Sequence, residues 1–198
     1  MADVLIFQGS PRKKGNTETL IEAVIDGIAS GGGTSELIRL AELNIHPCIG
    51  CGGCDKKGRC VVKDDMTPLY EKIMAARRVI LASPIYFYSI TAQAKAFVDR
   101  CQALWSLKHI KKAEGIWRDD PDRKGYLVSV AATRGERVFE GAVLVMKYAC
   151  DAMGIGYGGD LLVKGVDRRG EMANNAGELT RGKEFGRYCV ELTLESRP

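Results

Sequence analysis

The chain has 198 residues, of which 45% are hydrophobic and 27% are charged, and this composition excludes a disordered or collagen-like protein. The net charge of +4 comes from 29 basic and 25 acidic residues spread along the chain. We therefore expect no nucleic-acid partner, although a mildly basic surface favours anionic ligands. No apolar run approaches the roughly 20 residues that span a membrane, and no basic segment precedes the apolar run at 4–7. We expect a cytoplasmic protein without a signal peptide.

Short apolar runs alternate with amphipathic stretches along the whole chain, which we interpret as one domain over 1–198. In chain order they predict a strand at 4–7, a helix at 16–30, a strand at 35–40, a helix at 67–76, a strand at 79–82, a helix at 91–107, a strand at 126–131, a helix at 136–153, a strand at 157–163 and a helix at about 177–194. Asn16 is the expected N-cap of the first helix, and Gly31 to Gly33 end it. A loop rich in Cys and Gly covers about 42–65, and a charged loop covers 108–124.

This alternation predicts an α/β fold with a doubly wound, five-stranded parallel sheet and helices on both faces. Right-handed crossovers leave few topologies, and the flavodoxin-like strand order 2-1-3-4-5 is one of the two common ones. In such sheets, ligands bind beyond the carboxyl ends of the strands, where the strand order reverses. The loops after the first, third and fourth strands are therefore the candidate binding loops.

The loop after the first strand runs from Gly9 to Thr17 and leads directly into a helix, whose N-terminus favours an anion. Ser10, Asn16 and Thr17 can donate hydrogen bonds to phosphate oxygens, and Arg12 can add a charge-assisted contact. The loop lacks both the Gly-Lys-Ser/Thr of a P-loop and the Gly-x-Gly-x-x-Gly of a Rossmann fold. An ordinary strand–helix connection is the alternative.

The motifs of these loops together resemble the NADPH-dependent FMN reductase family. The resemblance rests on residues 9–12 (Gly-Ser-Pro-Arg) with 15–17 (Gly-Asn-Thr), on 83–86 (Ser-Pro-Ile-Tyr), and on 91–93 (Thr-Ala-Gln) with 95–100 (Lys-Ala-Phe-Val-Asp-Arg). It covers about residues 3–165 and implies FMN as the cofactor, with its phosphate on the first loop. It also implies that the segment with Pro84 and Ile85 lies against the isoalloxazine and ribityl chain, and that a segment after the fourth strand closes over the ring.

The residues themselves agree with these expectations. After the third strand, Tyr86 and Phe87 offer flat apolar faces and Ser89 can reach polar atoms, although the two aromatic residues can also be interpreted as core. After the fourth strand, Thr133 and Gly135 flank Arg134, whose charge can stabilise a reduced flavin. A solvated loop arginine is the alternative for Arg134.

Four cysteines lie close together, at Cys48, Cys51, Cys54 and Cys60, with gaps of two, two and five residues. Such compact spacing is typical of 4Fe–4S ligands, and the iron–sulfur flavoprotein branch of the family is similar in this respect. Zinc sites usually separate two Cys pairs by a longer spacer, so zinc is a weaker alternative, and free thiols are another. The helical residues Cys101, Cys150 and Cys189 are expected to be buried.

The combined prediction is an oxidoreductase that passes electrons between a donor such as NAD(P)H or ferredoxin, FMN and a 4Fe–4S cluster. No residue demands a role as a general acid or base. The resemblance also implies a homodimer or homotetramer. The alternatives are an NAD(P)H-dependent FMN or quinone reductase without a cluster, a passive flavodoxin-like electron carrier and, more weakly, a metal sensor.

Overall fold

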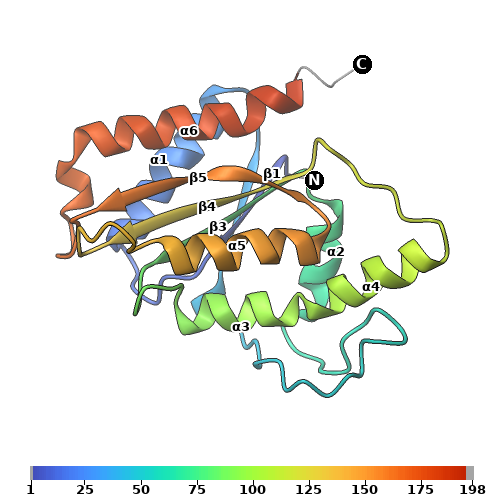
Figure 1. The fold of residues 1–198 in the computed structure, drawn as a ribbon. Coiled ribbons are helices and arrows are strands. Elements are labelled where there is room, and N and C mark those ends of the chain that lie inside the picture. Colours follow the sequence, from blue (N-terminus) through green and yellow to red (C-terminus); the bar gives the residue numbers. More distant parts are fainter. Residues whose placement is uncertain (1, 195–198) are drawn as a thin grey trace.

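The computed structural model describes residues 2–194 and contains a five-stranded parallel sheet with helices on both faces (Figure 1). The strand order β2-β1-β3-β4-β5 confirms the predicted flavodoxin-like arrangement. The strands are β1 (Val4–Gln8), β2 (Ser35–Arg39), β3 (Arg78–Pro84), β4 (Lys124–Ala131) and β5 (Gly156–Lys164).

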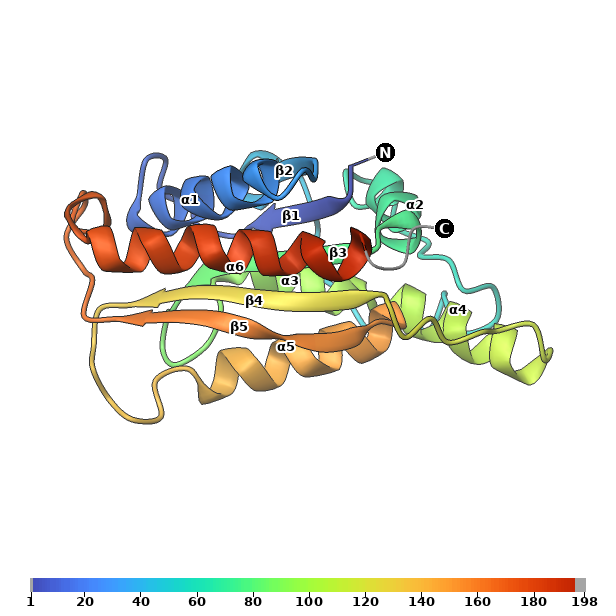
Figure 2. The same cartoon turned by 90° about the horizontal axis from the view of Figure 1, so that it is seen from above.

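Two helical layers sandwich the sheet (Figures 1 and 2). The helices α1 (Asn16–Ser30) and α6 (Ala176–Leu194) cover one face. The helices α2 (Thr67–Ala75), α3 (Ala92–Arg100) and α5 (Glu140–Met153) cover the other, and α4 (Gln102–Ala113) extends past the edge of the sheet. Two short 3-10 helices, Leu40–Glu42 and Met172–Asn174, follow β2 and precede α6.

Successive side chains of β1 point to opposite faces of the sheet, and this explains why helices cover both faces. Leu5 and Phe7 pack in the core beneath α2, α3 and α5, whereas Val4 and Ile6 pack beneath α1 and α6. Because both faces are covered, all five residues of β1 are apolar or buried, as is usual in parallel sheets. The backbones of α1 and α6 pack directly against each other, since a Cβ atom on Gly27 would lie only 2.1 Å from the carbonyl oxygen of Lys183.

Two helices begin or end at residues other than those predicted. The helix predicted at 91–107 turns at Cys101, whose N–H donates to the carbonyl of Val98, and it continues as α4 to Ala113 inside the predicted charged loop. The extension is stable because Lys108 is buried and donates to Asp151 at the end of α5.

The helix predicted at 136–153 begins only at Glu140. The residues before it form turns, in which the N–H of Val138 donates to the carbonyl of Gly135. Val138 and Phe139 are nevertheless buried, which explains the helical pattern in the sequence. Within residues 2–194, no helix is long and apolar enough to cross a membrane.

Candidate functional site

The loops after β1, β3 and β4 enclose a cavity of about 100 Å³ at the carboxyl edge of the sheet. Most of the predicted cofactor residues line this cavity, namely Ser10, Arg12, Asn16, Thr17, Pro84, Ile85 and Tyr86. The predicted residues Phe87, Ser89, Thr133, Arg134 and Gly135 are not among its lining residues. The cavity lies at the point where the strand order reverses, which is where the sheet topology predicted it.

The first loop leaves the N-terminus of α1 open toward the cavity. Gly15 occupies the N-cap position, and no side chain caps the first turn. The prediction of Asn16 as the N-cap was therefore wrong, because the helix already includes Asn16. The main-chain N–H groups of an uncapped first turn are available to an anionic ligand.

An ion pair between the buried Glu18 and the half-buried Arg39 holds this loop in shape. Lys14 has a left-handed φ of 52°, and its N–H donates to Glu18 Oε2 at 2.7 Å. Glu18 is ion-paired with Arg39, whose hydrogen bond lowers the pKa of the Glu18 carboxyl below its usual value. Arg39 thus neutralises an acidic group in the first turn of α1, so that the exposed Arg12 keeps the loop electropositive, whereas Lys13 is paired with Glu42 at 2.8 Å.

Asn16 joins the first loop to the segment after β5. Its Nδ2 donates to the carbonyl of Arg168 at 2.8 Å, and its Oδ1 accepts the N–H of Met172 at 3.2 Å. Val166 and Asp167 from this segment line the cavity, together with Val130 and Ala132. The sequence analysis missed these four residues, although the carboxyl end of the fifth strand pointed to Val166 and Asp167.

The loop after β3 forms a tight turn with two exposed aromatic residues at its tip. Tyr86 and Ser89 exchange main-chain hydrogen bonds, and Phe87 and Tyr88 between them have φ values of 48° and 61°. Such angles are costly for aromatic residues and tend to occur at functional sites. Phe87 is fully exposed and Tyr86 is 42% exposed, so neither residue belongs to the core.

The loop after β4 lies open to solvent beside the cavity. Thr133, Arg134 and Gly135 are exposed, whereas the neighbouring Ala132 reaches the cavity. The guanidinium of Arg134 packs over Gly165, where a Cβ atom would lie 2.5 Å from its central carbon. This contact places the guanidinium of Arg134 over the end of β5, and the residue remains exposed to solvent.

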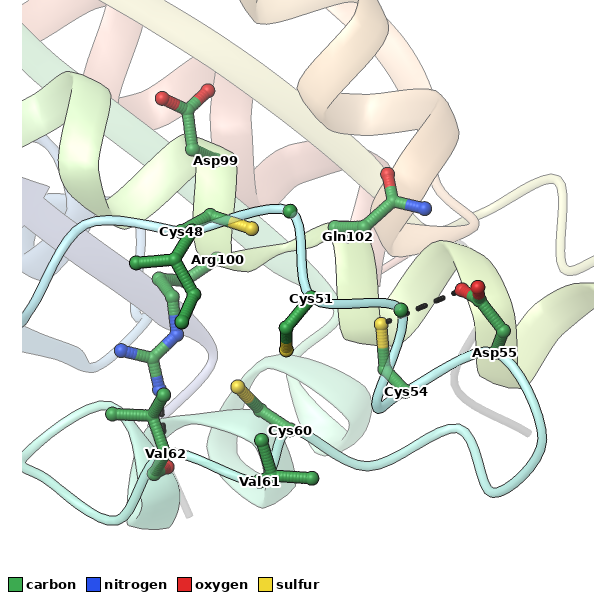
Figure 3. Close-up of a pocket in the computed structure, with 13 residues that line it drawn as sticks. Cys48, Cys51, Cys54, Asp55, Cys60, Val61, Val62, Asp99, Arg100 and Gln102 are labelled. Carbon is green, nitrogen blue, oxygen red and sulfur yellow. Dashed lines mark hydrogen bonds between the residues drawn. The ribbon is translucent and has the colours of Figure 1, made fainter.

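The four clustered cysteines line a second cavity, of about 500 Å³, below α3 and α4 (Figure 3). All four thiols are unpaired, and the sulfur atoms of Cys51 and Cys60 point toward each other. Ser106 on α4 donates to the sulfur of Cys54 at 3.6 Å. Gly50 and Gly52 have φ values of 65° and 69°, which only glycine adopts readily, and these let the chain turn between successive cysteines.

The thiols do not converge on one point. Within the described part of the chain, no three His, Cys, Asp or Glu side chains are grouped as a single metal ion would require. In a 4Fe–4S cluster each cysteine binds a different iron at a different corner, so its thiolates surround a volume instead of a point. Four thiols that line one roomy cavity supply the set of ligands that a 4Fe–4S cluster requires.

A buried ion pair closes the base of the cysteine loop. Asp64 and Arg100 each have side chains that are only 1% exposed, and Arg100 Nη1 lies 2.6 Å from Asp64 Oδ2. Asp64 also accepts the N–H groups of His46 and Met66. Burial by itself would raise the pKa of Asp64, but the hydrogen bonds from Arg100 and the two N–H groups outweigh it and hold the pKa at about 2.

One helix supports both cavities. At the N-terminus of α3, the buried Thr91 donates its hydroxyl to the carbonyl of Gly9 at 2.6 Å, and its N–H donates to Ser83 Oγ at 3.0 Å. At the other end of α3, Arg100 holds the cysteine loop. The two contacts are nine residues apart, or roughly 13 Å along the helix axis.

Comparison with known proteins agrees with this geometry. The profile of the NADPH-dependent FMN reductase family matches residues 2–155, which include α3, the whole cysteine cavity and the loops after β1, β3 and β4. The chain belongs to the NADPH-dependent FMN reductase family.

Within this family, the chain is similar to several iron–sulfur flavoproteins. It is 40% identical over 101 residues to one from Methanocaldococcus jannaschii, with 51% of this chain and 52% of that protein covered. It is 38% identical over 94 residues to one from Methanosarcina thermophila, with 48% and 49% covered. The chain thus spans about half the length of the curated relatives that it matches.

Solved structures share the fold at low sequence identity. An NAD(P)H:quinone oxidoreductase from Methanothermobacter marburgensis has a TM-score of 0.64 at 17% identity, covering 93% of this chain and 94% of its own. A WrbA-like flavodoxin from Agrobacterium tumefaciens has a TM-score of 0.60 at 13% identity, with both chains fully covered. These likenesses support the fold of this FMN reductase family member.

The ion pair at the base of the cysteine loop predicts an acid-sensitive stability. Because the pKa of Asp64 falls from an ordinary 3.8 to about 2 on folding, its contribution is fully present above pH ~4 and is lost as the pH falls toward 2. Asp64→Asn should lower the free energy of unfolding by about 3–5 kcal/mol at neutral pH, because it leaves Arg100 buried without its partner.

Urea denaturation of parent and variant at pH 6, 4 and 3 measures this effect. The difference between them should shrink as the pH falls. Asp26→Asn, at an exposed surface pair with Lys183, is the matched control and should change stability by less than about 1 kcal/mol. A parent–variant difference that stays constant between pH 6 and 3 would contradict the role assigned to Asp64.

Proposed function

We propose that this chain is an FMN-dependent oxidoreductase of the iron–sulfur flavoprotein type, which passes electrons between a donor, FMN and a 4Fe–4S cluster. The observation that carries the proposal is the pair of cavities whose loops are held at the two ends of α3. One has an open helix N-terminus and a cationic loop, and the other is lined by four free thiols. Family membership and the names of the relatives support the same reading.

The first cavity suits the phosphate end of FMN. Its volume of about 100 Å³ is below the roughly 300–1,000 Å³ of complete small-molecule sites, so it accommodates a phosphate and part of the ribityl chain. Ser10, Arg12 and Thr17 would hold the phosphate together with the first N–H groups of α1. The flavin ring would then lie on the open face beside Tyr86 and Arg134.

The second cavity suits a 4Fe–4S cluster held by Cys48, Cys51, Cys54 and Cys60. When bound, flavin exchanges electrons singly or as a hydride, and the cluster exchanges single electrons. Lys56, Lys57 and Arg59 are exposed on the same loop and offset the negative charge of thiolate ligands. This cationic surface also suits an acidic protein such as ferredoxin as the donor or acceptor, whereas NAD(P)H is the donor that the family name implies.

The exposed aromatic turn supports an assembly of more than one chain. Phe87 is fully exposed at a tip whose backbone angles are unfavourable for it. A second subunit that covers this tip would bury it next to the flavin ring. We therefore propose a homodimer or homotetramer, working in the reducing cytoplasm, where the four clustered thiols stay free of disulfides.

The phosphate assignment predicts a defined loss of affinity. Arg12→Ala should weaken FMN binding by about 1.5–3 kcal/mol, because it removes a hydrogen bond to a charged group. Riboflavin, which lacks the phosphate, should bind parent and variant equally. Fluorescence titration of apoprotein measures both ligands. Arg187→Ala, at an exposed position on α6 near Ser30, is the control and should bind FMN like the parent.

Equal FMN affinity in the parent and in the Arg12 variant would remove Arg12 from the site. Tighter binding of riboflavin than of FMN by the parent would overturn the phosphate assignment altogether.

The cluster assignment predicts the metal content. Anaerobically reconstituted protein should hold about four iron and four sulfide ions per chain. Cys51→Ala should lose most of the iron but retain FMN, because the two cavities use different loops. Cys189→Ala is the control, since burial raises the pKa of the Cys189 thiol to about 12 and the residue lies in the opposite helical layer.

Iron, sulfide and FMN are measured on the same samples. Parent protein that takes up zinc but no iron and sulfide would end the cluster assignment. Loss of FMN together with iron in the Cys51 variant would show that the cysteine loop also forms the flavin site.

A further inference from the structure

Arg100 is a buried cation in the wall of the cysteine cavity. Its side chain is 1% exposed, and it lines the cavity together with the four clustered cysteines. Figure 3 shows it running from α3 down to Val62 beside the cysteine loop. A charge buried this deeply requires partners that compensate for the loss of water.

Most of its hydrogen-bonding capacity is used to close the cysteine loop. Nη1 donates to the carbonyl of His46 and to Asp64, at 2.8 and 2.6 Å. Nη2 donates to the carbonyl of Val62 and to Asp64, at 3.3 and 3.1 Å. His46 lies two residues before Cys48 and Val62 lies two residues after Cys60, so Arg100 ties the two ends of the cysteine segment together.

One donor is left over. A guanidinium has five N–H groups, and the four on Nη1 and Nη2 are accounted for. Nε is buried and has no hydrogen-bond partner among the described residues. Buried donors are almost always paired in folded proteins, so an orphaned one in a cavity wall points to a ligand in that cavity.

We propose that Arg100 donates its Nε–H to a sulfur of the bound cluster or of its thiolate ligands, and that its charge sets the reduction potential of the cluster. This inference rests on the proposed function. Uptake of one electron makes the cluster one unit more negative, and a fixed cation beside it stabilises that reduced form. Hydrogen bonds to sulfur and local charge are known determinants of cluster potential.

Two substitutions separate this role from a purely structural one. Arg100→Lys and Arg100→Gln both lose the planar guanidinium, whose hydrogen bonds close the cysteine loop, but only lysine keeps the positive charge. At a fixed potential, Arg100→Gln should lower the ratio of reduced to oxidised cluster about tenfold, which is a shift of about −59 mV for one electron. Arg100→Lys should stay within about threefold of the parent ratio.

The measurement is an anaerobic potentiometric titration followed by electron paramagnetic resonance, with iron and sulfide analysed in each sample. The flavin potential in the same samples serves as the internal reference. Equal potentials in Arg100→Gln and parent would overturn the proposal. A shift in Arg100→Lys as large as that in Arg100→Gln would also overturn it, because loss of the hydrogen bonds that close the cysteine loop would by itself explain that result.

A second measurement covers variants that fail to retain the cluster. Parent protein labelled with 15N-arginine should show magnetic coupling between the reduced cluster and one arginine nitrogen in pulsed resonance spectra. No coupling in the parent would overturn the contact with Arg100 Nε. Parent protein without iron and sulfide would instead contradict the proposed function itself, and metal analysis reveals that before any potential is measured.

Discussion

The hydrogen bond from Thr91 to the carbonyl of Gly9 fixes the position of α3 against the sheet. It is buried, and Thr91 at the same time caps α3 through the N–H of Ala94. A Cβ atom on Gly9 would lie 2.7 Å from that of Ala94, so the first loop and the helix pack with no room to shift. The rigid helix carries this position to Arg100 and hence to the base of the cysteine loop.

An arginine–carboxylate ion pair supports the loop at each of the two cavities. An arginine is paired with a buried carboxylate at each cavity: the half-buried Arg39 with Glu18 near the first loop, and the buried Arg100 with Asp64 near the second. Glu18 also accepts the main-chain N–H of Lys14, and Asp64 accepts those of His46 and Met66, so that each carboxylate fixes a loop conformation. Both loops also carry exposed cations, such as Arg12 and Lys56, which attract anionic ligands.

The sequence was sufficient for the fold and for much of both cavities, because these depend on local patterns. Apolar runs predicted the strands, and their alternation with helices predicted a parallel sheet covered on both faces, for which the observed order 2-1-3-4-5 is one of the two common ones. The four clustered cysteines line one cavity as their spacing suggested. The ion pair of Asp64 and Arg100 was not predicted, since the two residues are 36 positions apart and no local pattern connects them.

Other features depended on tertiary contacts that no short pattern encodes. Asparagine is common at helix N-caps, yet the side chain of Asn16 bonds to the main chain of Arg168 and Met172 after the fifth strand. The turn of the chain at Cys101 interrupts an unbroken helical pattern, because α4 is drawn toward Asp151 through Lys108.

The central claim is that one chain holds both redox centres, and counting the electrons that the protein accepts tests it. Anaerobic titration of fully loaded protein with dithionite should consume about three electrons per chain, two for FMN and one for the cluster. An end point at two electrons, with only the flavin absorbance bleached, would contradict it.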